Sequence, residues 1–92
     1  MTSTTVTVTN QLGMHARAAA KFVQLATTFG ARIRVECGPR AMDGKSILGL
    51  LLLAATRGAS LTIVAEGDDE VAAVAALAGL VASEFGEGAW NA

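Results

Sequence analysis

Residues 31–37 read Ala31-Arg32-Ile33-Arg34-Val35-Glu36-Cys37, and apolar residues alternate with charged ones along the whole stretch. Successive side chains of a strand point to opposite faces, so this alternation predicts a β-strand with one buried face. The residues expected to point inward are Ala31, Ile33, Val35 and Cys37. Gly38-Pro39 is typical of a turn, and Arg40 to Asp43 then favours a short return strand.

Two further stretches alternate in the same way. Thr4 to Thr9 places Val6 and Val8 on one face, and Ser60 to Glu66 places Leu61, Ile63 and Ala65 on one face. Strands with a single apolar face need cover on one side only. We therefore predict an α+β domain of two layers, in which helices pack on one face of an antiparallel or mixed sheet.

Helical spacing of apolar residues predicts three covering helices. The first runs from Ala16 to Phe29 and ends at Gly30. The second begins after Ser46, a good N-cap, and runs from Ile47 to about Ala55. The third runs from about Glu70 to Phe85, and the carboxylates of the Gly67-Asp68-Asp69 turn are expected to cap it. Its buried stripe is expected to comprise Val74, Leu77, Val81 and Phe85.

The 92 residues suffice for one domain, 1–92, with a core from about residue 4 to 85 and a tail over 86–92. Charge is divided unevenly along the chain. All seven basic residues lie at or before Arg57, where two carboxylates oppose them and leave +5, whereas the six carboxylates beyond give −6. Arg17, Lys21 and Lys45 favour an acidic partner or a phosphate group. Nucleic acid is not expected, because the chain has no dense basic stripe and no Tyr.

Other classes of site and location are disfavoured by the composition. A single cysteine, Cys37, excludes an internal disulfide and suits a reducing compartment. No secretory signal is visible after Met1, and the longest apolar run, Ile47 to Ala55, is too short to insert into a membrane. One His, one Cys and scattered carboxylates predict no metal site. The expected location is the cytoplasm.

His15 is the only histidine, and it stands where the first predicted helix begins, in the sequence Gly13-Met14-His15-Ala16-Arg17. A helix start offers unpaired N–H groups, here those of Ala16 and Arg17, and the positive end of the helix dipole. The Arg17 guanidinium adds a fork suited to phosphate. A nucleophilic imidazole beside an anion cradle is what a reversible phosphoryl carrier needs.

The second predicted helix is apolar almost all round. Leu50 and Leu53 are expected in the core, which would leave Ile47, Leu48 and Leu51 partly exposed as an apolar patch typical of a protein interface. Gly44-Lys45-Ser46 superficially suggests a P-loop, but the first glycine of that motif would fall on Pro39.

Gly13-Met14-His15-Ala16-Arg17, Ala18-Ala19-Ala20-Lys21, and Gly44-Lys45-Ser46-Ile47-Leu48-Gly49-Leu50 together resemble the HPr phosphocarrier family of the phosphoenolpyruvate-dependent phosphotransferase system. The resemblance extends from about Val6 to Phe85. It implies an open-faced β-sandwich with four antiparallel strands in the order 1-4-2-3 and three helices on one face. Most sugar-transport members have proline where this chain has Ala18, so the sequence is more similar to proteobacterial HPr and to the nitrogen-branch member NPr.

The resemblance also implies a function and its residues. Nδ1 of His15 would take a phosphoryl group from phospho-enzyme I and pass it to an enzyme IIA, with Arg17 assisting. Ser46 would be the site of regulatory phosphorylation by an HPr kinase/phosphorylase, and the partner-docking residues would be Ala20, Ile47, Leu48 and Leu51. The chain would be a monomeric carrier rather than an enzyme, and it would need no cofactor.

Three alternatives stay open at this point. The chain could serve the nitrogen branch as an NPr. It could be a small acyl-phosphate hydrolase, although the strand-helix-strand-strand-helix-strand order of that class has no third helix and its chemistry needs no histidine. It could also be a purely regulatory binding module that keeps the docking surface without the chemistry.

Overall fold

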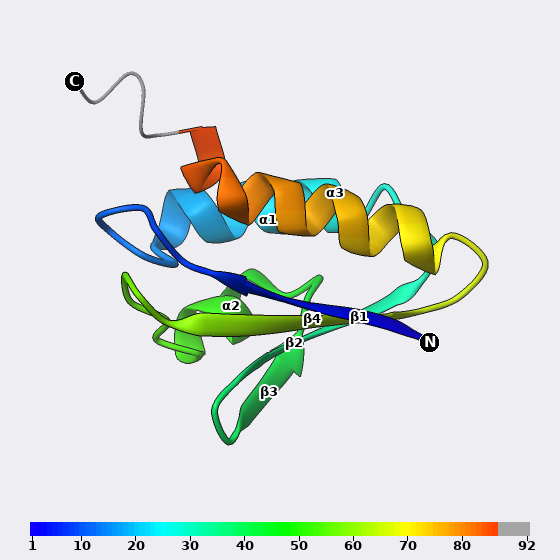
Figure 1. Ribbon diagram of the computed structural model, residues 1–92, viewed down its shortest axis with the longest axis horizontal. Coiled ribbons are helices and arrows are strands. Elements are labelled where there is room, and N and C mark those ends of the chain that lie inside the picture. Colours follow the sequence, from blue (N-terminus) through cyan, green and yellow to red (C-terminus); the bar gives the residue numbers. More distant parts are fainter. Residues whose placement is uncertain (87–92) are drawn as a thin grey trace.

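A computed structural model describes residues 1–86 of the chain. The elements follow in the order β1 (Thr2–Thr7), α1 (Ala16–Ala26), β2 (Arg32–Cys37), β3 (Arg40–Asp43), α2 (Ile47–Leu52), β4 (Ser60–Glu66), α3 (Glu70–Ala82) and the 3-10 turn η1 (Glu84–Gly86). The strands form one sheet in the order β1-β4-β2-β3, and every pairing is antiparallel. The predicted α+β class and strand order are therefore confirmed (Figure 1).

The alternating stretches form the central strands of the sheet. β4 lies between β1 and β2, with Thr62 opposite Thr5 on one side and Glu36 on the other. Ile33 and Val35 are buried on the helix-covered face while Arg32 and Arg34 are exposed, as the alternation predicted. Leu61, Ile63 and Ala65 of β4 are buried as well. The helix-covered face of the sheet is thus set by the side-chain period of two.

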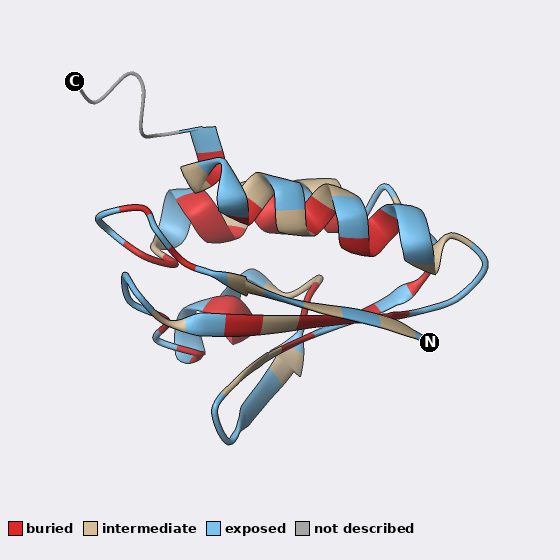
Figure 2. Ribbon diagram, viewed as in Figure 1, coloured by how far each residue is buried: buried red, intermediate tan, exposed pale blue. Residues whose placement is uncertain are grey.

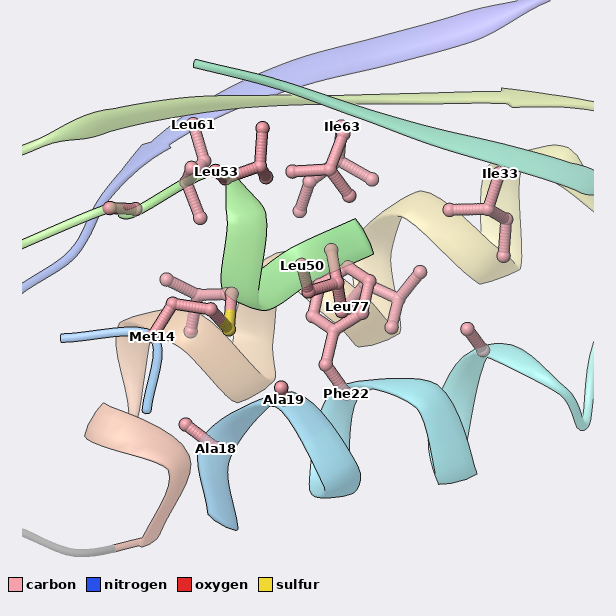
Figure 3. Packing of buried hydrophobic residues seen from close by; sticks show 14 of the residues in the cluster. Met14, Ala18, Ala19, Phe22, Ile33, Leu50, Leu53, Leu61, Ile63 and Leu77 are labelled. Atoms are coloured by element: carbon pink, nitrogen blue, oxygen red, sulfur yellow. The ribbon is translucent and has the colours of Figure 1, made fainter. Parts of the chain in front are cut away.

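The core lies between this face and the helices. Figure 2 shows the buried sides of α1 and α3 turned toward the sheet, and Figure 3 shows Phe22 of α1, Leu50 of α2 and Ile63 of β4 pointing into the same cluster. Phe22, Leu50 and Leu77 are fully buried. Each side chain of this size contributes about 1.5–3 kcal/mol when it leaves water. The structure has a helix, α2, between β3 and β4. The order of elements expected for an acyl-phosphate hydrolase contains no such third helix.

Three element boundaries differ from the sequence prediction. α1 ends at Ala26 rather than Phe29, because the hydroxyls of Thr27 and Thr28 donate to the carbonyls of Gln24 and Leu25 and so compete with helix continuation. β1 begins and ends two residues earlier than expected. α2 ends at Leu52 rather than Ala55, because Ala54 adopts a left-handed conformation with φ 54°.

The start of α3 also differs from the prediction. Asp69 stands at the N-cap but makes no capping hydrogen bond with its side chain. Its carboxylate instead accepts the N–H groups of Gly30 and Ala31, both at 2.9 Å, and so ties the start of β2 to the start of α3. The Gly30 N–H is the main cause that lowers the pKa of Asp69. The carboxylate of Glu70, rather than that of Asp69, accepts the Gly67 N–H, at 3.2 Å.

α3 ends earlier than predicted, but the predicted stripe of residues is buried. The helix ends at Ala82, and Phe85 is 1% exposed within η1, where its φ is 55°. Val74, Leu77 and Val81 are buried as predicted. Of the expected tail, residues 86–92, Gly86 closes η1 and the remaining six lie outside the described residues.

The left-handed conformation at Ala54 leads to a stability prediction. A left-handed backbone costs an L-residue about 1–2 kcal/mol, whereas glycine adopts it without that cost. Ala54→Gly should therefore raise the free energy of unfolding in urea by about 0.5–1 kcal/mol. The matched control is Ala72→Gly on the exposed side of α3, which should lower it by about 1 kcal/mol. A loss of stability in both variants would contradict the conformation assigned to Ala54.

Candidate functional site

The loop before α1 is fixed against the loop after α2. The N–H of Met14 donates to the carbonyl of Ala55 at 2.9 Å, and the Met14 side chain is buried. Gly13 has φ +66°, and a Cβ there would lie 2.5 Å from the Ala55 oxygen. Only glycine fits such a close approach with a positive φ. These contacts hold the backbone that leads into His15.

His15 is the N-cap of α1. Its backbone is extended, with φ −85° and ψ 179°, and its carbonyl accepts the first helical hydrogen bond, from Ala19 N–H at 2.8 Å. Its ring nitrogen Nδ1 accepts the N–H of Arg17 at 3.2 Å. A nitrogen that accepts a hydrogen bond carries a lone pair, so this geometry assigns the ring proton to Nε2. Nδ1 therefore carries the lone pair of the ring in this geometry.

The basic residues that lie near His15 in the sequence do not all lie near it in space. Arg17 is exposed in the first turn of α1. Lys21 donates its Nζ to the Phe85 carbonyl at 2.6 Å, and Lys45 donates its Nζ to the Phe29 carbonyl at 2.7 Å, beyond the far end of α1. Of these three basic residues, Lys45 therefore lies away from His15 in space although it shares the basic part of the sequence.

Ser46 caps α2, as predicted. Its Oγ accepts the Gly49 N–H at 2.9 Å. Lys45 joins this end of α2 to the region after α1, whereas Met14 joins the beginning of α1 to the residues after α2. The two helices consequently run in opposite directions. Ser46 and His15 therefore lie at opposite ends of the helix pair.

The exposed part of α2 forms an apolar patch, comprising Ile47, Leu48, Leu51 and Leu52. Their exposed fractions are 43%, 68%, 37% and 56%, whereas Leu50 and Leu53 are buried as predicted. Leu52, the last residue of α2, was not among the residues expected in this patch. Ala20, the remaining predicted docking residue, is half-buried on α1, which packs against α2.

Sequence reasoning also missed Leu12, a leucine that is 70% exposed in the loop just before His15. An apolar residue in an otherwise polar loop was the available signal.

Other kinds of site find little support in residues 1–86. No group of three or more His, Cys, Asp or Glu side chains is arranged to hold a metal ion within this range. None of the helices described there is long and apolar enough to cross a bilayer. A cleft of about 550 Å³ opens beside β2 and β3, where Arg32, Arg34 and Asp43 contribute to its lining, and neither His15 nor Arg17 does.

Comparisons with known proteins agree with this geometry. Residues 2–83 match the family described as "PTS HPr component phosphorylation site". The chain is 45% identical over 82 residues to the phosphocarrier protein HPr of Cupriavidus necator, covering 89% of this chain and 92% of that protein. It is 42% identical over 82 residues to the phosphocarrier protein NPr of Shewanella violacea, covering 89% and 90%.

A solved structure gives the same result. The crystal structure of HPr-C-His from Thermoanaerobacter tengcongensis superimposes with a TM-score of 0.91 at 42% identity, covering 95% of this chain and 98% of that chain. The family match, the similar phosphocarrier proteins and the strand order all indicate the same family. The chain belongs to the HPr family of phosphocarrier proteins.

Proposed function

We propose that this protein accepts a phosphoryl group on Nδ1 of His15 from phospho-enzyme I, itself charged by phosphoenolpyruvate, and donates it to an enzyme IIA. The single observation that supports this most directly is the 3.2 Å hydrogen bond from Arg17 N–H to Nδ1. It directs the lone pair of Nδ1 to the start of α1, where N–H groups and the helix dipole favour an anion.

The transfer step needs only the ring and the incoming group. The Nδ1 lone pair forms a bond to phosphorus while the bond between phosphorus and the donor breaks, and the donor keeps that electron pair. The ring proton remains on Nε2, so no proton has to move during attack. The transition state is loose, and catalysis consists mainly of positioning and charge stabilisation.

The N–H groups of Ala16 and Arg17 and the Arg17 guanidinium stabilise the transferred group. Once Nδ1 is bonded to phosphorus it no longer accepts a hydrogen bond, so the Arg17 N–H exchanges its nitrogen acceptor for a phosphoryl oxygen. The capping interaction of α1 is thereby replaced rather than lost. This exchange allows the carrier to load and unload without refolding the helix.

Ala20 and the apolar patch of α2 form the docking surface for enzyme I and enzyme IIA. The patch lies on α2, which packs against α1 and ends next to the loop that leads to His15, so a partner docked on it can reach the ring. The protein acts as a monomeric, cytoplasmic carrier that needs no cofactor and performs no turnover chemistry of its own. The relay serves sugar transport or, as the alternative that the similarity to an NPr supports, nitrogen regulation.

Ser46 is the regulatory site in this proposal, modified by an HPr kinase/phosphorylase. A phosphate at the N-terminus of α2 adds about −1.5 to −2 charges where a helix start accepts them. The fold should therefore tolerate the modification. The effect falls on the docking of an acidic partner, because Ser46 lies directly before the apolar patch.

The phosphoryl acceptor is tested by His15→Ala. With enzyme I and labelled phosphoenolpyruvate, the wild type should acquire one acid-labile, base-stable label, and His15→Ala should acquire none. Downstream transfer to an enzyme IIA should stop as well. A variant that is still labelled and still relays phosphate would contradict the proposal. Preserved regulatory activity without label would identify a binding module, and release of free phosphate by the wild type would identify a hydrolase.

The role of Arg17 is tested by Arg17→Lys. Lysine keeps the charge but loses the two-pronged guanidinium, so the transfer rate should fall by roughly tenfold, about 1.4 kcal/mol of transition-state stabilisation. Arg32→Lys, on the face of the sheet away from the helices, is the matched control and should transfer at the wild-type rate. Equal rates for the two variants would remove Arg17 from the mechanism.

The regulatory proposal is tested by Ser46→Asp. The added charge should raise the KM for this protein as substrate of enzyme I by about three- to tenfold and leave the melting temperature nearly unchanged. Ala75→Asp places the same charge on the exposed side of α3 and should not alter KM. The regulatory role is wrong if the two variants behave alike and no phosphoserine is found in cells.

A further inference from the structure

We propose that Asn10 is a positioning residue for phosphoryl transfer at His15, an inference that rests on the proposed function and deepens it. Asn10 is 1% exposed, and it is the one buried polar or charged side chain found in the described part of the chain. Buried polar side chains are costly unless they are hydrogen-bonded, so a retained one needs a structural or functional reason.

The side chain of Asn10 closes the loop that leads to His15. Its Nδ2 donates to the Gly13 carbonyl at 2.8 Å, and the Gly13 N–H donates back to the Asn10 carbonyl at 3.2 Å. The two hydrogen bonds join the ends of a four-residue turn through both main chain and side chain. The direction of the Gly13 carbonyl is therefore set by Asn10.

The same carbonyl also holds His15. The N–H of His15 donates to the Gly13 oxygen at 3.0 Å, so this oxygen accepts from Asn10 and from His15 together. Gly13 has little room to shift toward the loop after α2, because even an added Cβ would lie 2.5 Å from the Ala55 oxygen and 3.0 Å from Cα of Thr56. Met14, which lies between Gly13 and His15 in the sequence, is held by the hydrogen bond from its N–H to the Ala55 carbonyl. A change at Asn10 is thus passed to His15 through one shared acceptor.

This chain of contacts bears on the rate of transfer rather than on docking. Attack by Nδ1 requires the ring to lie in line with the departing group, and a displacement of about 1 Å can reduce a rate on the order of a hundredfold. The docking patch lies on α2, whereas the two hydrogen bonds between Asn10 and Gly13 lie in the loop before α1. Loss of the Asn10 donor should therefore lower kcat and leave KM for this protein nearly unchanged.

The experiment compares Asn10→Ala with Gln11→Ala, a neighbouring exposed residue whose side chain serves as the matched control. With enzyme I and phosphoenolpyruvate as donor, Asn10→Ala should lose roughly ten- to a hundredfold in kcat, with KM within about twofold of the control. The Arg17 amide proton should also move in the NMR spectrum, since its acceptor Nδ1 is displaced. A folded Asn10→Ala variant with the kcat of the control overturns the proposal, as does a rise in KM alone.

A measurement on the wild type keeps the proposal testable if Asn10→Ala does not fold. One Asn10 side-chain amide proton should be shifted and exchange slowly with solvent, unlike those of Gln11. Fast exchange of both Asn10 protons overturns the proposal. Failure of the proposed function is distinguishable, because the wild type would then carry no phosphate on His15. If the wild type is phosphorylated there and Asn10→Ala keeps its rate, only the positioning role fails.

Discussion

The first turn of α1 needs an acceptor for its unpaired N–H groups, and Nδ1 of His15 is that acceptor. Most helices use Ser, Thr, Asp or Asn at this position. A histidine there couples the start of the helix to Nδ1 of the ring. The hydrogen bond that stabilises α1 also selects the tautomer and points the lone pair at the helix N-terminus. The rest of the fold keeps this one arrangement in place.

Two loops from distant parts of the sequence supply that support. Gly13 and Met14 pack on Ala55 and Thr56, and Val8 exchanges hydrogen bonds with Gly58 and Ala59. The sheet order brings β1 and β4 together, so the loops that follow β1 and precede β4 meet at the same end. Since α2 runs opposite to α1, its exposed apolar face extends from the His15 end toward Ser46. The apolar patch therefore lies between the N-cap of α2 and the end of α2 that is nearer His15.

Much of the fold could be predicted from the alternation of apolar and polar residues and from the residue types that favour turns and helix caps. The alternation in 31–37 and 60–66 gave the correct buried faces, and Ser46 was correctly identified as a cap. Boundaries were less predictable, because they depend on side-chain bonds such as those of Thr27 and Thr28 and on the conformation of Ala54. Tertiary partners were least predictable. Asp69 binds Gly30 and Ala31, and Lys45 binds Phe29, across spacings that no local pattern encodes.

In the proposed relay, Nδ1 of His15 bonds to phosphorus and the Arg17 N–H then donates to a phosphoryl oxygen instead of to Nδ1. The most direct test is NMR of protein labelled with ¹⁵N and phosphorylated by enzyme I and phosphoenolpyruvate. Phosphorus should be coupled to Nδ1, and the Arg17 amide should be among the most strongly shifted signals. Phosphorus on Nε2 or on another residue, or an Arg17 amide that does not move, would contradict it.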